Sequence, residues 1–423
     1  MNAHLLSPSA PLAIRVDRMF DGLRDQLTER PVVLIEGGRI VAVAERGTRL
    51  PAGTRVLELG DVTLMPGFID THSHLALDGG LDPAGYLASL SDEDILGQMH
   101  KAARRAVLGG VTTVRDLGSP RTLAITLRKR LKAATLPAPD MVVAGPPLTT
   151  PAGHGHYLGG AVSGAPAIRA AVRSLLAQGV DLIKVMGSGG RLTPGTDTGS
   201  PQFSTAEIRA LVDEAHKHDL PVTVHAYPPA AIEQAADAGA DGIEHCFFAV
   251  NGGLAPDLNV LDAIARQGIV VCPTVGLAPS WPVPPQFQAF LDVFRSVVSL
   301  MHSRGVTLVA GIDAAALPGK QHDAVPHAVI ELAGLGLTSA EALRAGTATA
   351  ARACGLAGRK GVIAPGAERR RDRGAREPLA AHSRRGQGLF RRQVRGRGAR
   401  GVRPAKSRAA GLGPGAPFAH VTR

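Results

Sequence analysis

The 423-residue chain has few aromatic side chains, few cysteines and no long apolar run. Its three cysteines, Cys246, Cys272 and Cys354, are odd in number and widely spaced, which excludes a disulfide framework or a cysteine zinc finger and predicts reduced, buried thiols. No apolar run approaches the length of a membrane span, and the first residues lack a basic segment followed by a long apolar one. We therefore expect a soluble cytoplasmic protein with no membrane partner.

Basic residues outnumber acidic ones, but the excess is confined to one end of the chain. The 47 Lys and Arg against 36 Asp and Glu give a net charge of +11. Residues 368–423 hold 15 Arg and one Lys against three acidic residues, a net charge of +13, which leaves −2 for the preceding 367 residues. The body of the chain is thus near neutral, and nucleic acid is not an expected partner for it despite the basic tail.

From residue 61 onward, strand-like and helix-like segments alternate, which is typical of parallel β/α units. Eight such units over this length are the count of a closed (β/α)8 TIM barrel, so the predicted fold class is α/β. The predicted strands cover residues 62–69, 111–116, 141–144, 182–186, 222–225, 242–245, 269–272 and 307–312. Helical patterns cover residues 96–108, 123–133, 167–178, 205–217, 230–238, 260–267 and 287–303, and capping-box spacing occurs at Ser204 with Glu207 and at Thr338 with Glu341.

Short strand-like segments also precede the predicted barrel, at residues 12–16, 31–36, 39–44 and 55–58. A few strands alone are marginally stable, so they need partners from elsewhere in the chain. We predict that residues 1–60 form the first strands of a small, incomplete β-sandwich domain, that residues 61–357 form the barrel and that residues 358–367 return to the small domain. Residues 368–423 form the Arg-rich tail.

Six residues of metal-ligand type lie at the ends of predicted barrel strands. His72 and His74 are two apart at the end of the first, and positions two apart on a strand share a face. The others are Lys184, His225, His245 and Asp313. A single histidine at a strand end more often packs or caps, but five strands here deliver such residues to the one rim where barrels place their active sites. His216 and His218, in contrast, lie on different faces of a predicted helix and are interpreted as surface residues.

Several motifs make the chain similar to a known superfamily. They are MPGFIDTHSH at residues 65–74, GVTTVRD at 110–116, GHGH at 153–156, IKVMGSGG at 183–190, VHAY at 224–227, IEH at 243–245 and GID at 311–313. Together they resemble the amidohydrolase superfamily, in the branch that groups imidazolonepropionase-like hydrolases with Xaa-Pro dipeptidases. The resemblance extends from about residue 12 to residue 367.

The resemblance implies a site with two divalent metal ions, expected to be zinc. His72, His74 and Asp313 would hold the more buried ion, and His225 and His245 the more exposed one. Lys184, carboxylated on its amine, would bridge the two ions, and a buried lysine does lose its proton readily enough to capture carbon dioxide. Asp313 is implied as the catalytic proton acceptor and His154 as the residue that hydrogen-bonds the oxyanion. His154, His156 and Tyr227 are implied as substrate-binding residues.

The implied activity is metal-dependent cleavage of an amide or peptide bond, in a dipeptide or an N-acyl amino acid, by a hydroxide shared between the ions. One alternative is a mononuclear cyclic-amide hydrolase or deaminase of the imidazolonepropionase type, which lacks a bridging lysine. Another is a non-catalytic or damaged gene product whose basic tail binds nucleic acid. The sequence is compatible with a homo-oligomer and does not decide the oligomeric state. The sequence does not give the shape of the rim loops at residues 277–288 and 314–325, which set the substrate.

The Arg-rich tail departs from the pattern that the resemblance implies, which continues with a stretch like DADLVVVxGNPL. Permissible codons for residues 368–378, read one base later, give SADVTVVRGNP, and residues 382–392 can give IRDVARVSSVV. The tail is therefore predicted to be a frameshift product or a sequencing error. The rival interpretation is a disordered arm that binds nucleic acid, in which only Phe390 and Phe418 could stack on bases. Resequencing the codons around Ala367 distinguishes the two, because an intact frame there contradicts the frameshift.

Overall fold

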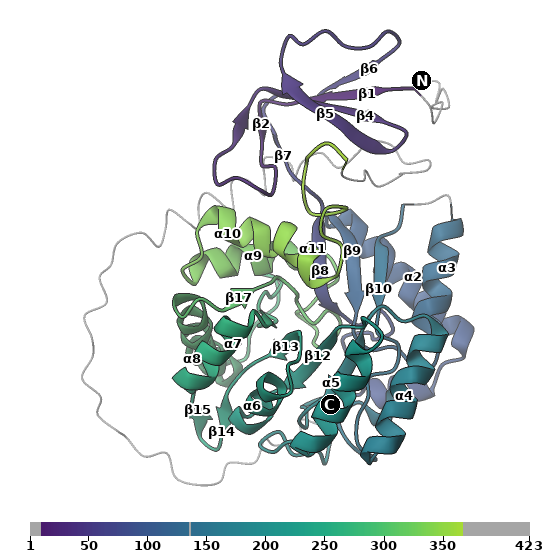
Figure 1. Ribbon diagram of the computed structural model, residues 1–423, viewed down its shortest axis with the longest axis vertical. Coiled ribbons are helices and arrows are strands. Elements are labelled where there is room, and N and C mark those ends of the chain that lie inside the picture. Colours follow the sequence, from purple (N-terminus) through teal and green to yellow (C-terminus); the bar gives the residue numbers. More distant parts are fainter. Residues whose placement is uncertain (1–9, 135–136, 367–423) are drawn as a thin grey trace, which may run out of the picture.

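The computed structural model describes residues 10–134 and 137–366, in which eight parallel strands form a barrel (Figure 1). The strands are β8 (Phe68–Ser73), β9 (Val111–Asp116), β10 (Asp140–Val143), β11 (Ile183–Met186), β12 (Val222–Ala226), β13 (Gly242–His245), β16 (Val270–Cys272) and β17 (Thr307–Leu308). They pair in the orders β10-β9-β8 and β11-β12-β13-β16-β17. Backbone hydrogen bonds from Leu148 to Lys184 and from Thr71 to Ala310 join the two sets, and this confirms the predicted α/β TIM-barrel fold.

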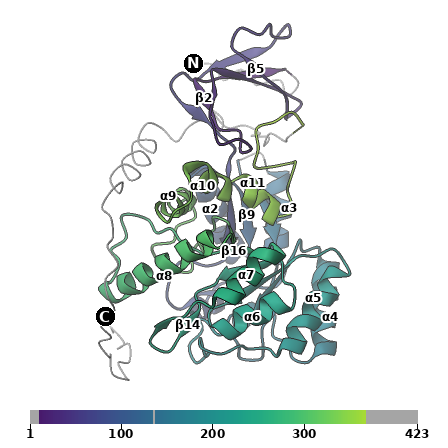
Figure 2. The ribbon, with the colours of Figure 1, turned by 60° about the vertical axis from the view of Figure 1, so that its left-hand side comes forward.

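Helices surround the barrel (Figure 2). Each amphipathic helix buries one apolar face against the strands, as Ile95 and Met99 of the second helix do. Both predicted capping boxes are present, and Ser91 with Asp94 forms another. The helices are α1 (Pro83–Ala88), α2 (Asp92–Leu108), α3 (Leu123–Ala133), α4 (Ala165–Gln178), α5 (Thr205–His216), α6 (Pro229–Asp237), α7 (Leu258–Gln267), α8 (Pro285–Ser303), α9 (Val325–Gly334), α10 (Ser339–Ala345) and α11 (Ala348–Ala353), with a 3-10 turn at His156–Leu158 and a hairpin of β14 (Ala249–Val250) and β15 (Gly253–Leu254). None of the described helices combines the length and apolar composition that a membrane span requires.

The first and last barrel strands differ from the prediction. The segment predicted as one strand is two, because Pro66 has no amide hydrogen to continue a ladder and β7 (Thr63–Leu64) pairs with the small domain instead. The barrel strand begins at Phe68, so His72 lies inside it and only His74 follows it. At the other end, β17 is two residues long, and the amide of Ala310 bonds to the carbonyl of Ala345 instead of a strand partner.

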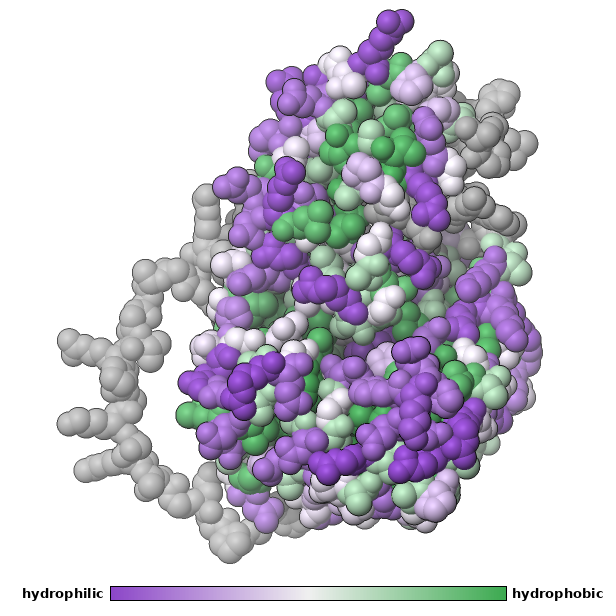
Figure 3. Space-filling model, viewed as in Figure 1, coloured by the Kyte–Doolittle hydropathy of each residue, from purple (hydrophilic) through white to green (hydrophobic). Residues whose placement is uncertain are grey.

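The small domain packs above the barrel as two sheets (Figure 1). Their strand orders are β5-β4-β1-β6 and β3-β2-β7, with bounds β1 (Leu12–Arg15), β2 (Arg18–Met19), β3 (Thr28–Glu29), β4 (Pro31–Glu36), β5 (Arg39–Glu45) and β6 (Arg55–Glu58). The chain returns to it where the amide of Ile363 donates to the carbonyl of Asp21. An apolar pocket lined by Ile14, Val33 and Ile35 opens beneath the sheets. In Figure 3, hydrophobic residues gather in the upper part of the molecule, where the small domain lies. The tail for which a frameshift is predicted lies outside the described residues.

Candidate metal centre and active site

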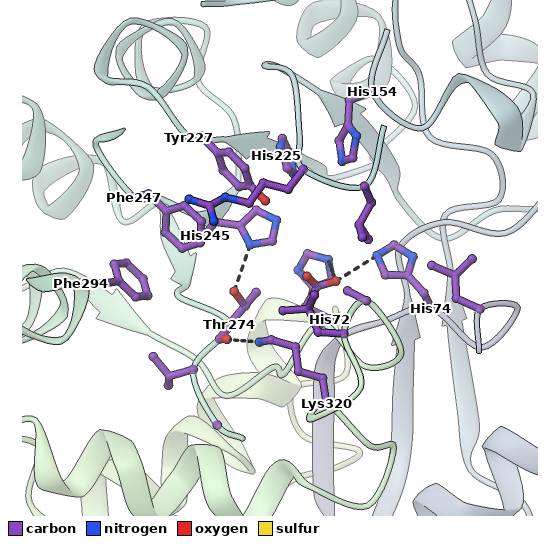
Figure 4. Close-up of a pocket in the computed structure, with 18 of the residues that line it drawn as sticks. His72, His74, His154, His225, Tyr227, His245, Phe247, Thr274, Phe294 and Lys320 are labelled. Carbon is purple, nitrogen blue, oxygen red and sulfur yellow. Dashed lines mark hydrogen bonds and ion pairs between the residues drawn. The ribbon is translucent and has the colours of Figure 1, made fainter. Parts of the chain in front are cut away.

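The six candidate ligands line one pocket at the carboxyl ends of the barrel strands, and Figure 4 shows the four histidines among them. His72 lies in β8, Lys184 in β11, His225 in β12 and His245 at the end of β13, while His74 and Asp313 follow β8 and β17. Asp313 Oδ1 is 3.3 Å from the Nε2 atoms of both His72 and His74. Ligand atoms of His72, His245 and Asp313 lie within 4.8 Å of one another, and the rings of His225 and His245 are 4.7 Å apart. This donor set and spacing fit a divalent cation such as zinc.

Each of the four histidines is held by one ring nitrogen, which leaves the other for the centre. The Nδ1 atoms of His72, His74 and His245 contact Glu244 at 2.7 Å, the carbonyl of Gly118 at 3.2 Å and the hydroxyl of Thr274 at 3.0 Å. His225 is reversed, because its Nε2 contacts the carbonyl of Gly189 at 3.2 Å. A hydrogen bond on the far nitrogen fixes the ring orientation and the tautomer of metal-binding histidines. Burial lowers the pKa of His72 to about 4, so its neutral form is the one present at pH 7.

Lys184 lies at the centre of this group without a hydrogen-bond partner. The residue is 1% exposed, and no described residue accepts a hydrogen bond from its Nζ. A buried ammonium left unpaired is costly, and burial lowers the pKa of Lys184 to about 8. A lowered pKa makes the neutral, nucleophilic form of this amine more accessible. The residues around it include a group of ligand atoms that could hold a metal ion.

A buried ion pair forms the floor of the site. Arg115 Nη2 donates to Glu244 Oε1 at 2.8 Å, and Thr223 Oγ1 donates to the same oxygen at 2.5 Å. The other carboxylate oxygen of Glu244, Oε2, is hydrogen-bonded to His72 Nδ1. Although burial alone would raise the pKa of Glu244, Arg115 and His72 hold it well below its ordinary value. The ionised carboxylate thus anchors His72 and links β8, β9, β12 and β13 within the barrel.

Replacing Arg115 by Met is expected to destabilise the protein by about 3–5 kcal/mol, because the carboxylate of Glu244 would stay buried without its cation. Denaturant unfolding monitored by circular dichroism measures this free energy. Arg304→Met is the matched control, since Arg304 pairs with Asp262 at the surface and its loss should change stability little. Similar unfolding midpoints for the two variants would show that the buried pair of Arg115 and Glu244 does not stabilise the protein in this way.

Two of the site residues have strained backbone conformations. His245 and Asp313 have φ angles of 67° and 57°, and Thr274, which holds His245, has φ of 51°. Residues with side chains rarely adopt this left-handed region. Lys320 fastens the segment, because its Nζ donates to the carbonyl of Thr274 at 2.6 Å (Figure 4) and to the carbonyl of Ile312 at 2.7 Å. The clamp keeps the ends of β16 and β17 together beneath the ligands.

His154 lies in the loop after β10 beside the candidate ligands, and its ring centroid is 4.7 Å from that of His225. The hydroxyl of Thr193 contacts its Nδ1 at 2.8 Å while accepting from the amide of Gly155, so the hydroxyl proton can serve His154 and leave Nε2 as the donor. Burial lowers the pKa of His154 to about 3. Gly190 is required here, since a Cβ atom would lie 2.3 Å from His154 Nε2.

The structure brings Tyr227 into the group but not His156. Tyr227 is half-buried and lines the pocket, and its ring centroid lies 4.4 Å from that of His225 with the two rings tilted by 40°. His156 is exposed, its Nδ1 contacts the carbonyl of Gly153 at 3.0 Å and its ring packs on Tyr157. The left-handed Gly155 between the two histidines turns the chain and points their side chains apart.

Sequence reasoning missed the residues that support the ligands, above all Arg115, Glu244, Thr274 and Lys320. A signal existed for the first two, because opposite charges in apolar barrel strands predict a buried pair. It also missed a set of rings that lines the outer part of the pocket, namely Phe247, Phe287, Phe290 and Phe294. Three of these recur at helical spacing on α8, a pattern that more often marks core packing.

The match to a protein-family model agrees with this fold and these strand ends. Residues 63–368 match the amidohydrolase family, and the chain belongs to that family. Ochratoxinase from Aspergillus niger is 27% identical over an alignment of 329 positions that covers 68% of this chain and 64% of the ochratoxinase. The chain thus spans less than two thirds of the length of that curated relative.

Solved structures share the fold along most of the chain. A prolidase complexed with N-methylphosphonate-L-proline is 27% identical with a TM-score of 0.72, covering 85% of this chain and 91% of the prolidase. A Xaa-Pro dipeptidase with methionine bound in its active site has a TM-score of 0.74 at 23% identity and covers 85% and 92% of the two chains. The second likeness supports the fold alone.

Proposed function

We propose that the chain is a metal-dependent hydrolase that cleaves an amide or peptide bond of a small molecule. The observation that carries the proposal is Lys184, a buried amine without a hydrogen-bond partner among the described residues, which lines one pocket with four oriented histidines and Asp313. The family match supports hydrolysis of carbon–nitrogen bonds, and the similarity to a prolidase and to ochratoxinase supports an amide as the bond.

The proposed metal ligands are His72, His74 and Asp313 for one divalent cation and His225 and His245 for a second, with carboxylated Lys184 as the bridge. Zinc is the expected ion, because imidazole and carboxylate ligands suit it. When bound, the cations supply Lewis acidity, which lowers the pKa of a water molecule and polarises the scissile carbonyl.

The protein's own groups would handle protons and charge around the reacting carbonyl. Asp313 would accept the proton of the attacking water and return it to the departing amine. Its charge is secured by its neighbours: burial opposes ionisation, but His72, His74 and His245 hold the pKa of Asp313 well below its ordinary value. His154 lines the same pocket, and its Nε2 would donate a hydrogen bond to the oxyanion.

The experiment that tests the proposal combines metal analysis of the purified full chain with a substrate panel. The panel holds Xaa-Pro and other dipeptides, N-acyl amino acids and cyclic amides. Two equivalents of a divalent metal per chain and turnover of linear amides are expected. One equivalent with turnover of cyclic amides alone would replace the proposal by the mononuclear alternative, and no turnover of any amide by metal-loaded protein would reject amide hydrolysis.

Replacing His154 by Ala is expected to lower kcat about 100-fold with a small change in KM, because a donor to the oxyanion acts mainly in the transition state. Steady-state kinetics on the best substrate of the panel measures both constants. His156→Ala is the control, since His156 is the same residue type two positions away but outside the pocket, and it should stay within about two-fold of the parent. Equal losses in both variants would indicate a general disturbance of the loop.

A further inference from the structure

Aromatic residues are scarce in the chain, yet they are concentrated at the mouth of the site. The chain has one Trp, three Tyr and ten Phe, and two of those Tyr and four of those Phe line this pocket. On α8, Phe287, Phe290 and Phe294 recur three and four positions apart and so share one helix face. That face points at the pocket.

The rings form a continuous path outward from the candidate ligands. The centroid of Phe247 is 5.4 Å from that of His245, and Tyr227 stacks on Phe247 at 4.6 Å. Phe290 and Phe294 meet Phe247 edge-on, at 5.2 Å and 4.6 Å. Separations of this size and such tilts are typical of favourable aromatic pairs.

Most of these rings are only partly covered by the protein. Phe294 is 2% exposed, whereas Tyr227, Phe247, Phe287 and Phe290 are half-buried. A core cluster would bury all of its rings, so the open ring faces are available to a ligand. A flat apolar group held there would complete their burial and add the offset or edge-to-face contacts that aromatic rings favour.

Apart from Lys184, one lysine or arginine side chain that lines the pocket has no ion-pair or hydrogen-bond partner among the described residues. Arg295 bonds Glu331 and Asp292, and the amine of Lys320 is used by two carbonyl groups. Glu331 is also occupied by the amide of Gly276. Arg191 forms no ion pair with any described acidic residue, and its guanidinium lies 5.1 Å from the centre of the Phe290 ring.

The loop that carries Arg191 is itself anchored. The amide of Gly189 donates to the carbonyl of Asp197, and the amide of Gly190 donates to the hydroxyl of Thr196. A guanidinium is well suited to pairing with a carboxylate, and here it lies beside the aromatic wall. A ligand that uses both features therefore needs a ring and a carboxylate close together, on the same side of the scissile bond.

We propose that the pocket selects N-acylated aromatic amino acids, with the ring of the departing amino acid against Phe247 and Phe290 and its carboxylate at Arg191. This inference rests on the proposed amide hydrolysis. It assigns the specificity to residues of the loops after β11 and β13 and of α8, whereas the proposed cleavage belongs to the strand ends.

Binding can be measured without turnover, because the chain has one tryptophan and it lies beside the pocket. Trp281 is 5.9 Å from Phe287, so its emission should change when a ligand occupies the aromatic wall. The probes are 3-phenylpropanoate, hexanoate and 3-phenylpropanol, titrated into the full-length metal-loaded protein, with calorimetry as the second readout. 3-Phenylpropanoate should bind about 10-fold more tightly than either of the others.

Two variants test the assignment of the ring and carboxylate sites. Phe290→Ala should lower the affinity for 3-phenylpropanoate about 10-fold. The ratio of kcat/KM for N-acetylphenylalanine to kcat/KM for N-acetylleucine should fall by about the same factor. Arg191→Gln should remove the preference for the acid over the alcohol. Val293→Ala is the control on the same helix, because Val293 is 50% exposed and does not line the pocket.

The outcomes separate this inference from the proposed function. The aromatic site would be rejected if amides were hydrolysed with no preference for aromatic amino acids, or if Phe290→Ala did not change the affinity for 3-phenylpropanoate. Either result would leave the proposed hydrolase function unaffected. Tight binding of 3-phenylpropanoate without turnover of any amide would support the aromatic site and reject the hydrolase.

Discussion

Replacing Asp313 by Asn is expected to lower kcat/KM for amide hydrolysis by about 10³- to 10⁴-fold. The substitution keeps the size of the side chain, so the strained turn after β17 can keep its shape. It removes the negative charge that lies 3.3 Å from both His72 and His74, and with it a ligand and the proton acceptor. Steady-state kinetics with metal analysis of the same sample measures the loss.

Asp262→Asn is the matched control for that variant, because the same substitution there disturbs only a surface pair with Arg304. It should leave kcat/KM within about two-fold of the parent. If Asp313→Asn retained more than a tenth of the parent activity with its metal in place, Asp313 could not be the group that moves the proton.

Replacing Lys184 by Ala is expected to reduce the bound metal from two equivalents to one or none and to lower kcat/KM by about 10³-fold. The variant loses the bridging carboxylate and leaves space in the middle of the histidines. Acetate or propionate can enter that space and offer two oxygens, so added carboxylate should restore part of the metal content and activity. Lys132→Ala, an exposed position on α3, is the control that should show neither the loss nor the recovery.

Metal content of the Lys184 variant discriminates between the competing sites. An unchanged single equivalent in both parent and variant would remove the basis for a two-cation site and favour the mononuclear alternative. Circular dichroism of each variant separates a loss of metal from a loss of fold, and recovery by acetate requires a folded site.

The carboxyl ends of parallel strands made much of the candidate site predictable from sequence. Because every such strand ends at the same rim, His225, His245 and Lys184 could be placed together without knowing any loop. The first strand was less predictable: the apolar run at residues 62–69 continues through Pro66, and the pairing of β7 with the small domain depends on strands far away in sequence.

The supporting residues could not be placed in the same way, because their roles depend on pairings across the barrel. Glu244 and Arg115 are 129 positions apart and meet only once the barrel closes. Lys320 reaches the carbonyl of Thr274 from a rim loop whose path the sequence does not give. The rings of α8 were recognisable as a helical face, but which side of the barrel that face meets is a tertiary property.

The left-handed backbone at His245, Thr274 and Asp313 has an evolutionary consequence. Each of these residues carries a conformational cost of about 1–2 kcal/mol that glycine would avoid, yet glycine would remove the functional side chain. At these three positions, selection for higher stability therefore favours glycine, whereas selection for activity favours the functional side chain. Adaptation to heat should proceed through the helices and the small domain, and should leave these three codons untouched.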